Sequence, residues 1–280
     1  MGLLSGLDIF GLGELEKKEI YEKKEKKLEQ KAAPIKEEDI LFDKTYTCPI
    51  CDNEFKARTV RAGKARLLGT DLDLRPKYDG IDMIKYDTVV CPVCGYATLS
   101  RYFKFLTSAQ SKLIRANISA NFKGRKPDDK VYTYEQALER YKLVLANAIV
   151  KRAKASEKAY ICLKSGWLLR GMQESLDGSD QGYLFKKAAL EKQEKEYLQN
   201  ALDGFLAARQ SEAFPMCGMD EFTVDYLIAA LAMNMEQYDL SIKIISNLLG
   251  SSQVNSRMKD KVRNLKDVLV ERMKKAKSES

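Results

Sequence analysis

Two Cys-Pro-x-Cys pairs constrain the fold of this chain more than any other feature of its sequence. The first pair is Cys48 and Cys51, the second is Cys91 and Cys94, and 39 residues lie between the pairs. Two cysteines separated by two residues can direct both sulfurs at one tetrahedral ion, at about 2.3 Å from zinc. The pairs therefore predict one four-cysteine metal site that joins two distant parts of the chain.

The residues around the cysteines suit the tight turns that such a site needs. A proline follows the first cysteine of each pair and fixes φ at the start of the turn. Gly95 follows the second pair and can adopt a positive φ without steric cost. Asp52 holds the matching position after the first pair, and aspartate tolerates that conformation better than most residues. Both pairs thus have the sequence of a metal-binding knuckle.

Zinc is the metal that we expect, in a structural role. A four-sulfur tetrahedron also suits iron, and residues 91–95 (Cys-Pro-Val-Cys-Gly) are similar to the knuckle of rubredoxin. The long spacer between the pairs does not match the compact rubredoxin domain, which favours zinc over iron. Because four thiolates leave no open position for water, the metal should support folding rather than hydrolysis.

The composition excludes several classes of enzyme. The chain contains no histidine. This removes His-based acid and base catalysis, Ser-His triads, Cys-His nucleophiles and His-ligated metals. We assign no catalytic residue and expect a protein that is not an enzyme.

The cysteine pattern and the N-terminus indicate a cytoplasmic protein. Four of the six cysteines fall at metal-ligand spacing, which is typical of a reduced chain. The first 15 residues have no basic region and carry Asp8 inside their apolar stretch, unlike a secretory signal. No apolar run approaches the roughly 20 residues that a membrane-spanning helix needs.

Changes in residue pattern divide the chain into three parts. Residues 1–40 contain interleaved Glu and Lys that predict an exposed N-terminal helical arm. Residues 41–105 are rich in alternating aromatic, Thr and Val residues, so we expect a small zinc-ribbon-like β module. Residues 106–280 follow a 3.6-residue period and predict an α-helical domain. The expected fold class is α+β, mostly α.

The helical part shows weak internal repetition. Residues 134–141 and 197–205 each carry a small residue four positions before an aromatic residue, and residues 238–245 repeat the pattern with Ser241 as the small residue. They resemble the second helix of a tetratricopeptide repeat, with first-helix partners in residues 158–170 and 223–235. The small residues are 64 and 40 positions apart rather than a regular 34. We therefore expect a tetratricopeptide-like domain with irregular insertions, and a generic helical bundle is the alternative.

A further motif lies between the cysteine pairs. Asp71, Asp73 and Arg75 alternate with leucines, and in a strand they would share one face. Two carboxylates beside a guanidinium form either an ion-pair network or a weak site for Mg²⁺ or an anion. We expect the ion-pair network, because nothing nearby resembles a nucleophile or a site for an activated water.

Basic residues gather at the C-terminus of a chain whose net charge is +8. Residues 257–277 hold nine basic and three acidic side chains. Such a helix can contact nucleic acid or an acidic partner, although a solvated helix face is the commoner explanation. The cations near the cysteines could instead compensate the charge of a zinc ion with four thiolates; they are Arg58, Arg61, Lys64, Arg66, Arg101 and Lys104.

Four stretches of sequence carry a resemblance to a known family. They are Thr-Cys-Pro-Ile-Cys at 47–51, Asp-Leu-Asp-Leu-Arg at 71–75 with Tyr78, the run at 86–90, and Cys-Pro-Val-Cys-Gly-Tyr-Ala at 91–97. They resemble the bacterial "domain of unknown function 2225" family, from about residue 40 to the end. The resemblance implies a soluble bacterial protein with a zinc-ribbon-like start and tetratricopeptide-like helices. It supplies no catalytic residues.

These features predict a metal-stabilised scaffold that presents a helical groove to a protein partner. Its metal ligands would be Cys48, Cys51, Cys91 and Cys94. One alternative is a nucleic-acid-associated zinc-ribbon protein that uses its basic surface. The other is a rubredoxin-like iron electron carrier.

Overall fold

The computed structural model describes residues 9, 11, 36–124 and 129–278. The chain divides into two units, residues 1–35 and residues 36–280. The helical arm predicted over residues 1–40 lies almost entirely outside the described residues. Within its described part, a 3-10 helix, η3 (Glu37–Ile40), leads directly into the first strand.

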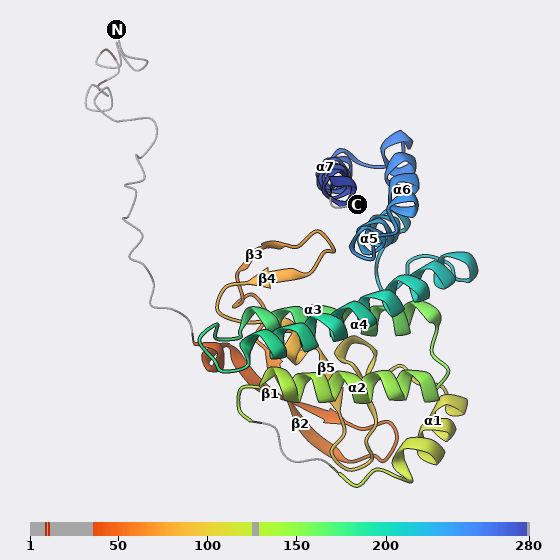
Figure 1. Ribbon diagram of the computed structural model, residues 1–280. Coiled ribbons are helices and arrows are strands. Elements are labelled where there is room, and N and C mark those ends of the chain that lie inside the picture. Colours follow the sequence, from red (N-terminus) through yellow and green to blue (C-terminus); the bar gives the residue numbers. More distant parts are fainter. Residues whose placement is uncertain (1–8, 10, 12–35, 125–128, 279–280) are drawn as a thin grey trace. The chain divides into compact units, whose positions relative to one another are not determined.

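Three β-hairpins make up most of the first third of the larger unit (Figure 1). Their strands are β1 (Leu41–Thr47), β2 (Glu54–Val60), β3 (Leu67–Thr70), β4 (Pro76–Tyr78), β5 (Thr88–Val90) and β6 (Ala97–Leu99). Strands β1 and β2, β3 and β4, and β5 and β6 pair antiparallel, and each pair is a separate two-stranded sheet. The register of the first hairpin places Tyr46 opposite Phe55.

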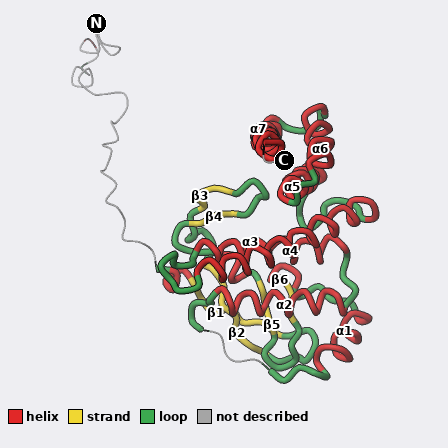
Figure 2. Tube along the Cα trace, viewed as in Figure 1, coloured by secondary structure: helices red, strands yellow, loops and turns green. Residues whose placement is uncertain are grey.

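From residue 108 onward the described chain is almost entirely helical (Figure 2). The α-helices are α1 (Ser108–Ile114), α2 (Tyr134–Val150), α3 (Ala155–Glu174), α4 (Tyr183–Ser211), α5 (Glu221–Asn234), α6 (Tyr238–Gly250) and α7 (Ser256–Ser278). Shorter helical segments are η4 (Met83–Tyr86), η5 (Ser100–Tyr102) and the π-helix η6 (Arg115–Ser119). Each helix from α2 to α7 packs against the next. The predicted fold class, α+β and mostly α, is confirmed.

Local sequence signals set where several helices begin. Thr107 before α1 and Thr133 before α2 each form a capping box with a glutamine three residues later. Asp220 accepts a hydrogen bond from the backbone N–H of Thr223 at the start of α5. These caps satisfy N–H groups that have no partner inside the helix.

The largest hydrophobic core joins strands to helices. Val90 of β5 and Leu99 of β6 belong to the same buried cluster as Tyr141 of α2, Leu163 of α3 and Leu202 of α4. Helix α2 packs across both β5 and β6. The boundary predicted between residues 105 and 106 therefore falls inside one compact unit.

Helices α3 and α4 approach each other closely. A Cβ atom on Gly204 of α4 would lie 2.8 Å from the Cβ atom of Ala159 on α3. A Cβ atom on Gly166 of α3 would lie 2.6 Å from the Cδ2 atom of Leu198 on α4. The helices therefore need small residues where they meet, and two segments predicted as partners, within 158–170 and 197–205, do face each other. Whether they form a tetratricopeptide repeat stays a prediction.

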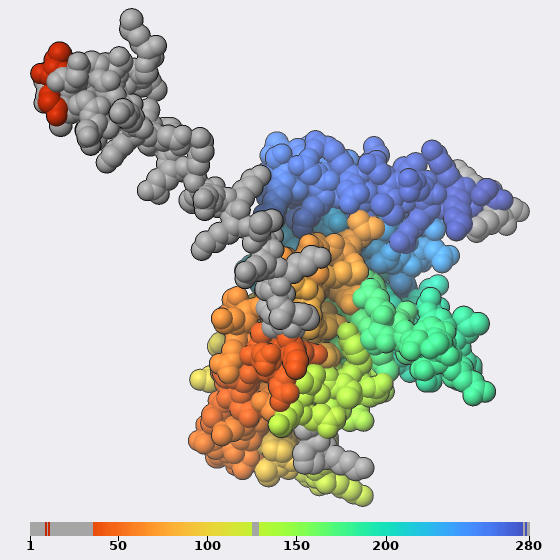
Figure 3. All heavy atoms as spheres, turned by 90° about the vertical axis from the view of Figure 1, so that its left-hand side faces the viewer, coloured from red at the N-terminus to blue at the C-terminus, as the bar shows by residue number. Residues whose placement is uncertain are grey.

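Helices α5, α6 and α7 enclose another core. Helix α7 contributes the buried residues Val262, Leu265 and Leu269. Leu72 and Leu74, from the loop between β3 and β4, pack against this core, and Figure 3 shows the hairpin region in orange against the last helices in blue. Most of the described basic residues of α7 are exposed, so this helix has an apolar inner face and a basic outer face.

Candidate metal centre

The four cysteines lie in the turns of two separate hairpins. Cys48 directly follows β1, and the first pair closes the β1–β2 hairpin. Cys91 directly follows β5, and the second pair closes the β5–β6 hairpin. Because short antiparallel hairpins project their turns at one end, each sheet offers two sulfurs from a rigid base.

The turn geometry agrees with the expectation from sequence. In the first knuckle the N–H of Asp52 donates to the carbonyl oxygen of Cys48 at 2.9 Å, and in the second the N–H of Gly95 donates to that of Cys91 at 3.2 Å. Asp52 has φ of 58° and Gly95 has φ of 71°. Both positions predicted to need a left-handed backbone are therefore confirmed.

The two turns bring all four sulfurs together. The four Sγ atoms lie within 4.8 Å of one another, with 3.5 Å between Cys48 and Cys94 and 3.6 Å between Cys51 and Cys91. A tetrahedron with metal–sulfur bonds of about 2.3 Å has edges of about 3.8 Å. The spacing of the sulfurs therefore fits one tetrahedral ion, and this group could hold a metal.

Contacts within the cluster favour a thiolate at Cys91. The neighbouring thiols of Cys48 and Cys94 lower the pKa of Cys91 most, and the backbone N–H groups of Cys94 and Val93 lower it further. The pKa of Cys94 is raised by its contacts with Cys48 and Cys91 and then by burial. Since metals bind thiolates rather than thiols, stabilising one thiolate is a first step towards the state that a metal needs.

The cluster sits in an aromatic core of its own. Tyr46, Phe55, Tyr96 and Phe103 surround it, with ring centroids 5.2 Å apart for Tyr46 and Phe103 and for Tyr96 and Phe103. Cys48, Cys91 and Cys94 are buried, and Cys51 is half-buried. A closed, largely dry site of this kind suits a metal that supports the fold.

Helix α2 fixes the second knuckle to the helical body. Asn147 donates a hydrogen bond from Nδ2 to the carbonyl oxygen of Gly95 at 3.1 Å. Arg140 donates to the hydroxyl of Thr88 at 3.1 Å and to its carbonyl oxygen at 2.9 Å. Thr88 is the first residue of β5, the strand that leads directly into Cys91. A Cβ atom on Gly95 would lie 2.6 Å from the ring of Phe122, so only glycine fits there.

Several cations that were expected to compensate the cluster have other partners. Arg58 pairs with Asp43 at 3.1 Å, and Arg66 pairs with Asp79 at 2.9 Å. Arg101 donates to the carbonyl oxygen of Cys217 at 2.7 Å. Acidic side chains or a carbonyl oxygen therefore account for the positions of these three arginines.

Asp71, Asp73 and Arg75 do not lie in a strand, the arrangement in which they would share one face. These residues form the turn between β3 and β4, where the N–H of Asp71 donates to the carbonyl oxygen of Arg75 at 2.9 Å. Leu74 has φ of 67°, which a strand does not allow. The alternation of charged and apolar residues therefore comes from a tight loop with one side facing α3 and the other facing the core of α5 to α7.

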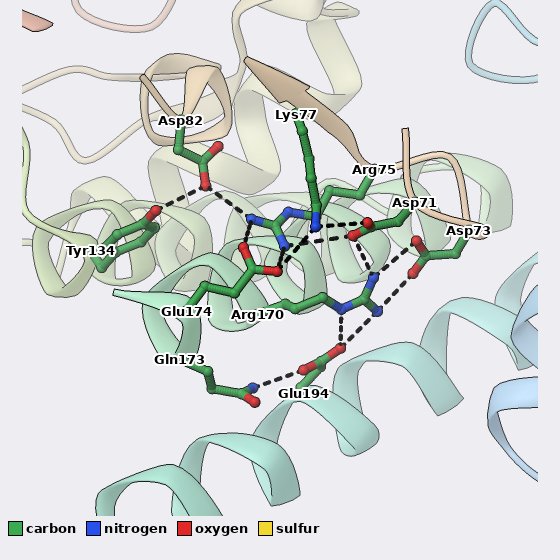
Figure 4. Close-up of polar contacts among 10 residues, drawn as sticks. All are labelled: Asp71, Asp73, Arg75, Lys77, Asp82, Tyr134, Arg170, Gln173, Glu174 and Glu194. Atoms are coloured by element: carbon green, nitrogen blue, oxygen red, sulfur yellow. Dashed lines mark hydrogen bonds and ion pairs between the residues drawn. The ribbon is translucent and has the colours of Figure 1, made fainter. Parts of the chain in front are cut away.

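The same three residues take part in the predicted ion-pair network (Figure 4). Arg75 donates to both carboxylate oxygens of Glu174 on α3, at 3.0 and 2.8 Å. Arg170 on α3 donates to both oxygens of Asp73, at 3.0 and 2.8 Å, and to Glu194 on α4 at 2.7 Å. Two bidentate arginine–carboxylate pairs thus hold the loop between β3 and β4 against α3, and the contact of Arg170 with Glu194 links it to α4.

Further groups complete this ionic cluster. Lys77 pairs with Asp71 at 3.0 Å, and Tyr134 donates to Asp82 at 3.2 Å. Burial lowers the pKa of Arg170, but the bonds from Asp73 and Glu194 outweigh burial and raise it. Burial also raises the pKa of Asp82. Each of these charged groups has an oppositely charged partner within the cluster, so the cluster acts as an ion-pair network, in which the Nε atom of Arg75 is buried without a hydrogen-bond partner among the described residues.

The members of this cluster on α3 and α4 were not predicted from the sequence. Arg170 and Glu174 are spaced one helical turn apart in a helix whose neighbouring residues are mostly buried and apolar. Charged residues at that spacing in such a helix were the available signal. Among the described residues, the one group of three or more Cys, His, Asp or Glu placed to share an ion is the four-cysteine group.

The two remaining cysteines lie apart from the cluster. Cys162 is buried in the largest core, and burial raises its pKa to about 11. Cys217 donates from Sγ to the carbonyl oxygen of Ser156 at 3.3 Å, and burial raises its pKa as well. Neither has the lowered pKa of a reactive thiol.

A family model matches most of the chain. The sequence model of a family described as "Uncharacterized protein conserved in bacteria (DUF2225)" matches residues 41–269. No curated protein and no solved structure matches the chain. Within the described residues, no helix has the length and apolar character needed to cross a membrane.

Proposed function

The chain belongs to this bacterial family, and from that premise we propose that it is a metal-stabilised scaffold that presents a helical surface to a protein partner. In this proposal one Zn²⁺ ion is held by Cys48, Cys51, Cys91 and Cys94. The protein acts in the cytoplasm, where its thiols stay reduced, and it catalyses no reaction.

The gathering of four sulfurs within 4.8 Å carries the proposal. Each knuckle closes a β-hairpin, as in a zinc ribbon, and the sulfur spacing suits one tetrahedral ion. Four protein ligands would leave no position for water or substrate, which assigns the metal to folding. Structural zinc sites contribute on the order of 10 kcal/mol to small modules, and the four cysteines here lie within the one small core that the two hairpins share.

The helical part supports the interaction role. Helices α2 to α7 pack in chain order, each against the next, as in proteins built from stacked helix pairs. Such stacks offer long surfaces for peptides and helices. The small residues where α3 meets α4 support the tetratricopeptide-like interpretation, because close helix approach is typical of those repeats.

A nucleic-acid role is the second candidate, favoured by one observation. The outer face of α7 carries most of the basic residues of that helix, including Arg257, Arg263 and Lys266. A basic helix face attracts phosphates, with an affinity that falls steeply as salt rises. The interaction with protein is preferred because apolar side chains accompany the lysines on this face, as described below.

Crosslinking of the full chain in a bacterial host that contains it tests the proposal. We expect crosslinks from α2 to α7 to a protein partner, and we expect them to be lost in a Cys91→Ser variant that binds no metal. Binding of single-stranded RNA with a strong salt dependence, and no protein crosslink, would favour the second candidate. A red colour of the purified protein would assign iron instead of zinc.

A further inference from the structure

Helices α6 and α7 leave an apolar groove at the surface of the unit. Its volume is about 340 Å³, and it is lined by the buried side chains of Ile245 and Leu269 and the exposed side chains of Ile242 and Val270. Ile242 is 39% exposed and Val270 is 40% exposed. Exposed aliphatic residues beside a buried apolar floor are typical of a docking surface.

The charges at this groove are all of one sign. Lys266 and Lys274 line it eight residues apart, about 12 Å along the helix axis, with Val270 midway on the same face. Neither lysine forms an ion pair with any residue in the described part of the chain. No acidic side chain is among the described lining residues. Asp267 and Glu271 lie about 60° and about 100° round α7 from Val270, and neither lines the groove.

We propose that the α6–α7 groove binds an amphipathic helix of a partner protein, with acidic residues beside its apolar stripe. This inference rests on the scaffold function proposed above and names its binding site. Apolar side chains at i, i+3, i+4 and i+7 of the partner fill the groove between Ile242 and Val270. Aspartate or glutamate on its flanks pairs with Lys266 and Lys274, which selects the partner by charge.

Other occupants fit the groove less well. In a symmetric contact that places this groove on the two-fold axis, the groove of one copy would meet the groove of the other, so the lysines would face lysines. A nucleic acid would pair with Lys266 and Lys274 but would leave the apolar side chains of Ile242 and Val270 exposed to water. An acidic amphipathic helix matches both the apolar lining and the positive rim.

A peptide selection against the full chain tests the inference. The probe is a displayed library of peptides of about 18 residues, or five helical turns, with apolar residues fixed at helical spacing and all other positions randomised. We expect the enriched peptides to be rich in Asp and Glu next to the apolar stripe. Their affinity should fall at least about tenfold for Ile242→Asp and for the double variant Lys266→Glu/Lys274→Glu.

Two controls separate binding from folding. Lys192→Glu reverses an exposed charge on α4, away from the groove, and should leave peptide affinity unchanged. Peptides with lysine in place of the selected acidic residues should bind the Lys266→Glu/Lys274→Glu variant better than the wild type. This charge-swap rescue requires a folded groove, because an unfolded variant could not recover affinity.

Several outcomes would overturn the inference. They are no enrichment, enrichment without acidic residues, or equal affinity for the wild type and Ile242→Asp. Leu4 and Leu7 are apolar residues of the N-terminal segment. If peptides bound only after Leu4→Asp and Leu7→Asp, the N-terminal segment of the chain itself would be the occupant of the groove. A dimer lost in Ile242→Asp would assign it to a second copy, and a 20-nucleotide RNA released by Lys266→Glu/Lys274→Glu would assign it to nucleic acid. If a protein partner from the host still bound both Ile242→Asp and Lys266→Glu/Lys274→Glu, the groove would not be its binding site. The proposed scaffold function would be unaffected by that result.

Discussion

Asn147, near the end of α2, donates a hydrogen bond from Nδ2 to the carbonyl oxygen of Gly95 at 3.1 Å. Gly95 turns the chain after the second cysteine pair with φ of 71°, and the Asn147 side chain is completely buried. One amide group therefore ties the helical body to the candidate metal centre. The knuckle depends on this helix as well as on its own hairpin.

Replacing Asn147 should weaken the knuckle without removing a ligand. We expect Asn147→Ala to lower the free energy of unfolding by about 1–3 kcal/mol, because it leaves the buried carbonyl of Gly95 without a donor. Zinc transfer from the protein to a chromogenic chelator should become faster. Urea unfolding and the rate of zinc transfer measure the two effects.

Asn200→Ala is the matched control for this variant. Asn200 on α4 donates to the carbonyl oxygen of Glu196 at 2.8 Å on an exposed surface, just as Asn147 also donates to Leu143 at 2.9 Å. The control loses that local bond but no contact with the knuckle, so zinc transfer should stay at the wild-type rate. Equal transfer rates for Asn147→Ala and the wild type would show that α2 does not support the metal centre.

Breaking the ionic cluster should destabilise the protein strongly. Arg170→Met would leave the carboxylate of Asp73, which is 1% exposed, without its cation. An unpaired buried charge of this kind costs about 3–5 kcal/mol, which thermal and urea unfolding would detect. Arg263→Met removes an exposed pair with Asp260 and should cost at most about 1 kcal/mol. Similar losses in the two variants would mean that the cluster contributes no more than a surface pair.

The metal centre could be predicted from sequence because its signals are local. Each Cys-Pro-x-Cys pair fixes its own turn, and Asp52 and Gly95 occupy the positions where the backbone must be left-handed. The gathering of Cys48 and Cys94 then follows from the preference of one ion for four sulfurs. No knowledge of the helices is needed for that step.

The ionic cluster could be predicted only in part. Asp73 and Arg75 stood out by composition, but their partners Arg170 and Glu174 lie 97 and 99 positions away in sequence. Helical periodicity identifies a buried face without stating which loop covers it. Charged and apolar residues alternate around Leu74 with a period of two residues, as they do in a strand. A tight loop that packs on two sides produces the same alternation, so the sequence pattern does not distinguish the two structures.

The close contact between α3 and α4 gives a steric prediction. Gly204→Ala places a Cβ atom 2.8 Å from the Cβ atom of Ala159. The helices must move apart, and we expect a loss of about 1–3 kcal/mol, although alanine favours a helix over glycine by about 1 kcal/mol. Gly250→Ala, at the end of α6 with open space around it, should be neutral or slightly stabilising. A Gly204→Ala protein that melts at or above the wild-type temperature would contradict this packing.

The ionic cluster also predicts how stability depends on pH. Burial raises the pKa of Glu174, but the bonds from Arg75 and Lys77 outweigh burial and lower it below 4.5. A carboxylate with a lowered pKa in the folded state stabilises the protein above its unfolded pKa, and this contribution is lost as pH falls. Glu174→Gln should therefore show a shallower fall in the free energy of unfolding between about pH 5 and pH 3 than the wild type.

Protonation of the cysteines affects the wild type and Glu174→Gln equally. The difference between their pH profiles of the free energy of unfolding therefore reports on Glu174 alone. Glu191→Gln is the control, since Glu191 makes a weak contact of 3.9 Å with Lys187 on an exposed surface. Its pH profile should follow the wild type. If Glu174→Gln also followed the wild type, the contact with Arg75 would contribute nothing to acid stability.

Metal content of the purified full chain tests the central claim most directly. Elemental analysis of protein prepared without chelators should find about one zinc ion per chain, and the same amount in Cys217→Ser, which changes a cysteine outside the cluster. Cys91→Ser should retain less than about a tenth of that metal and lose amide protection first in residues 41–105. Wild-type protein with neither zinc nor iron in stoichiometric amount would contradict the four-sulfur metal centre and the scaffold built on it.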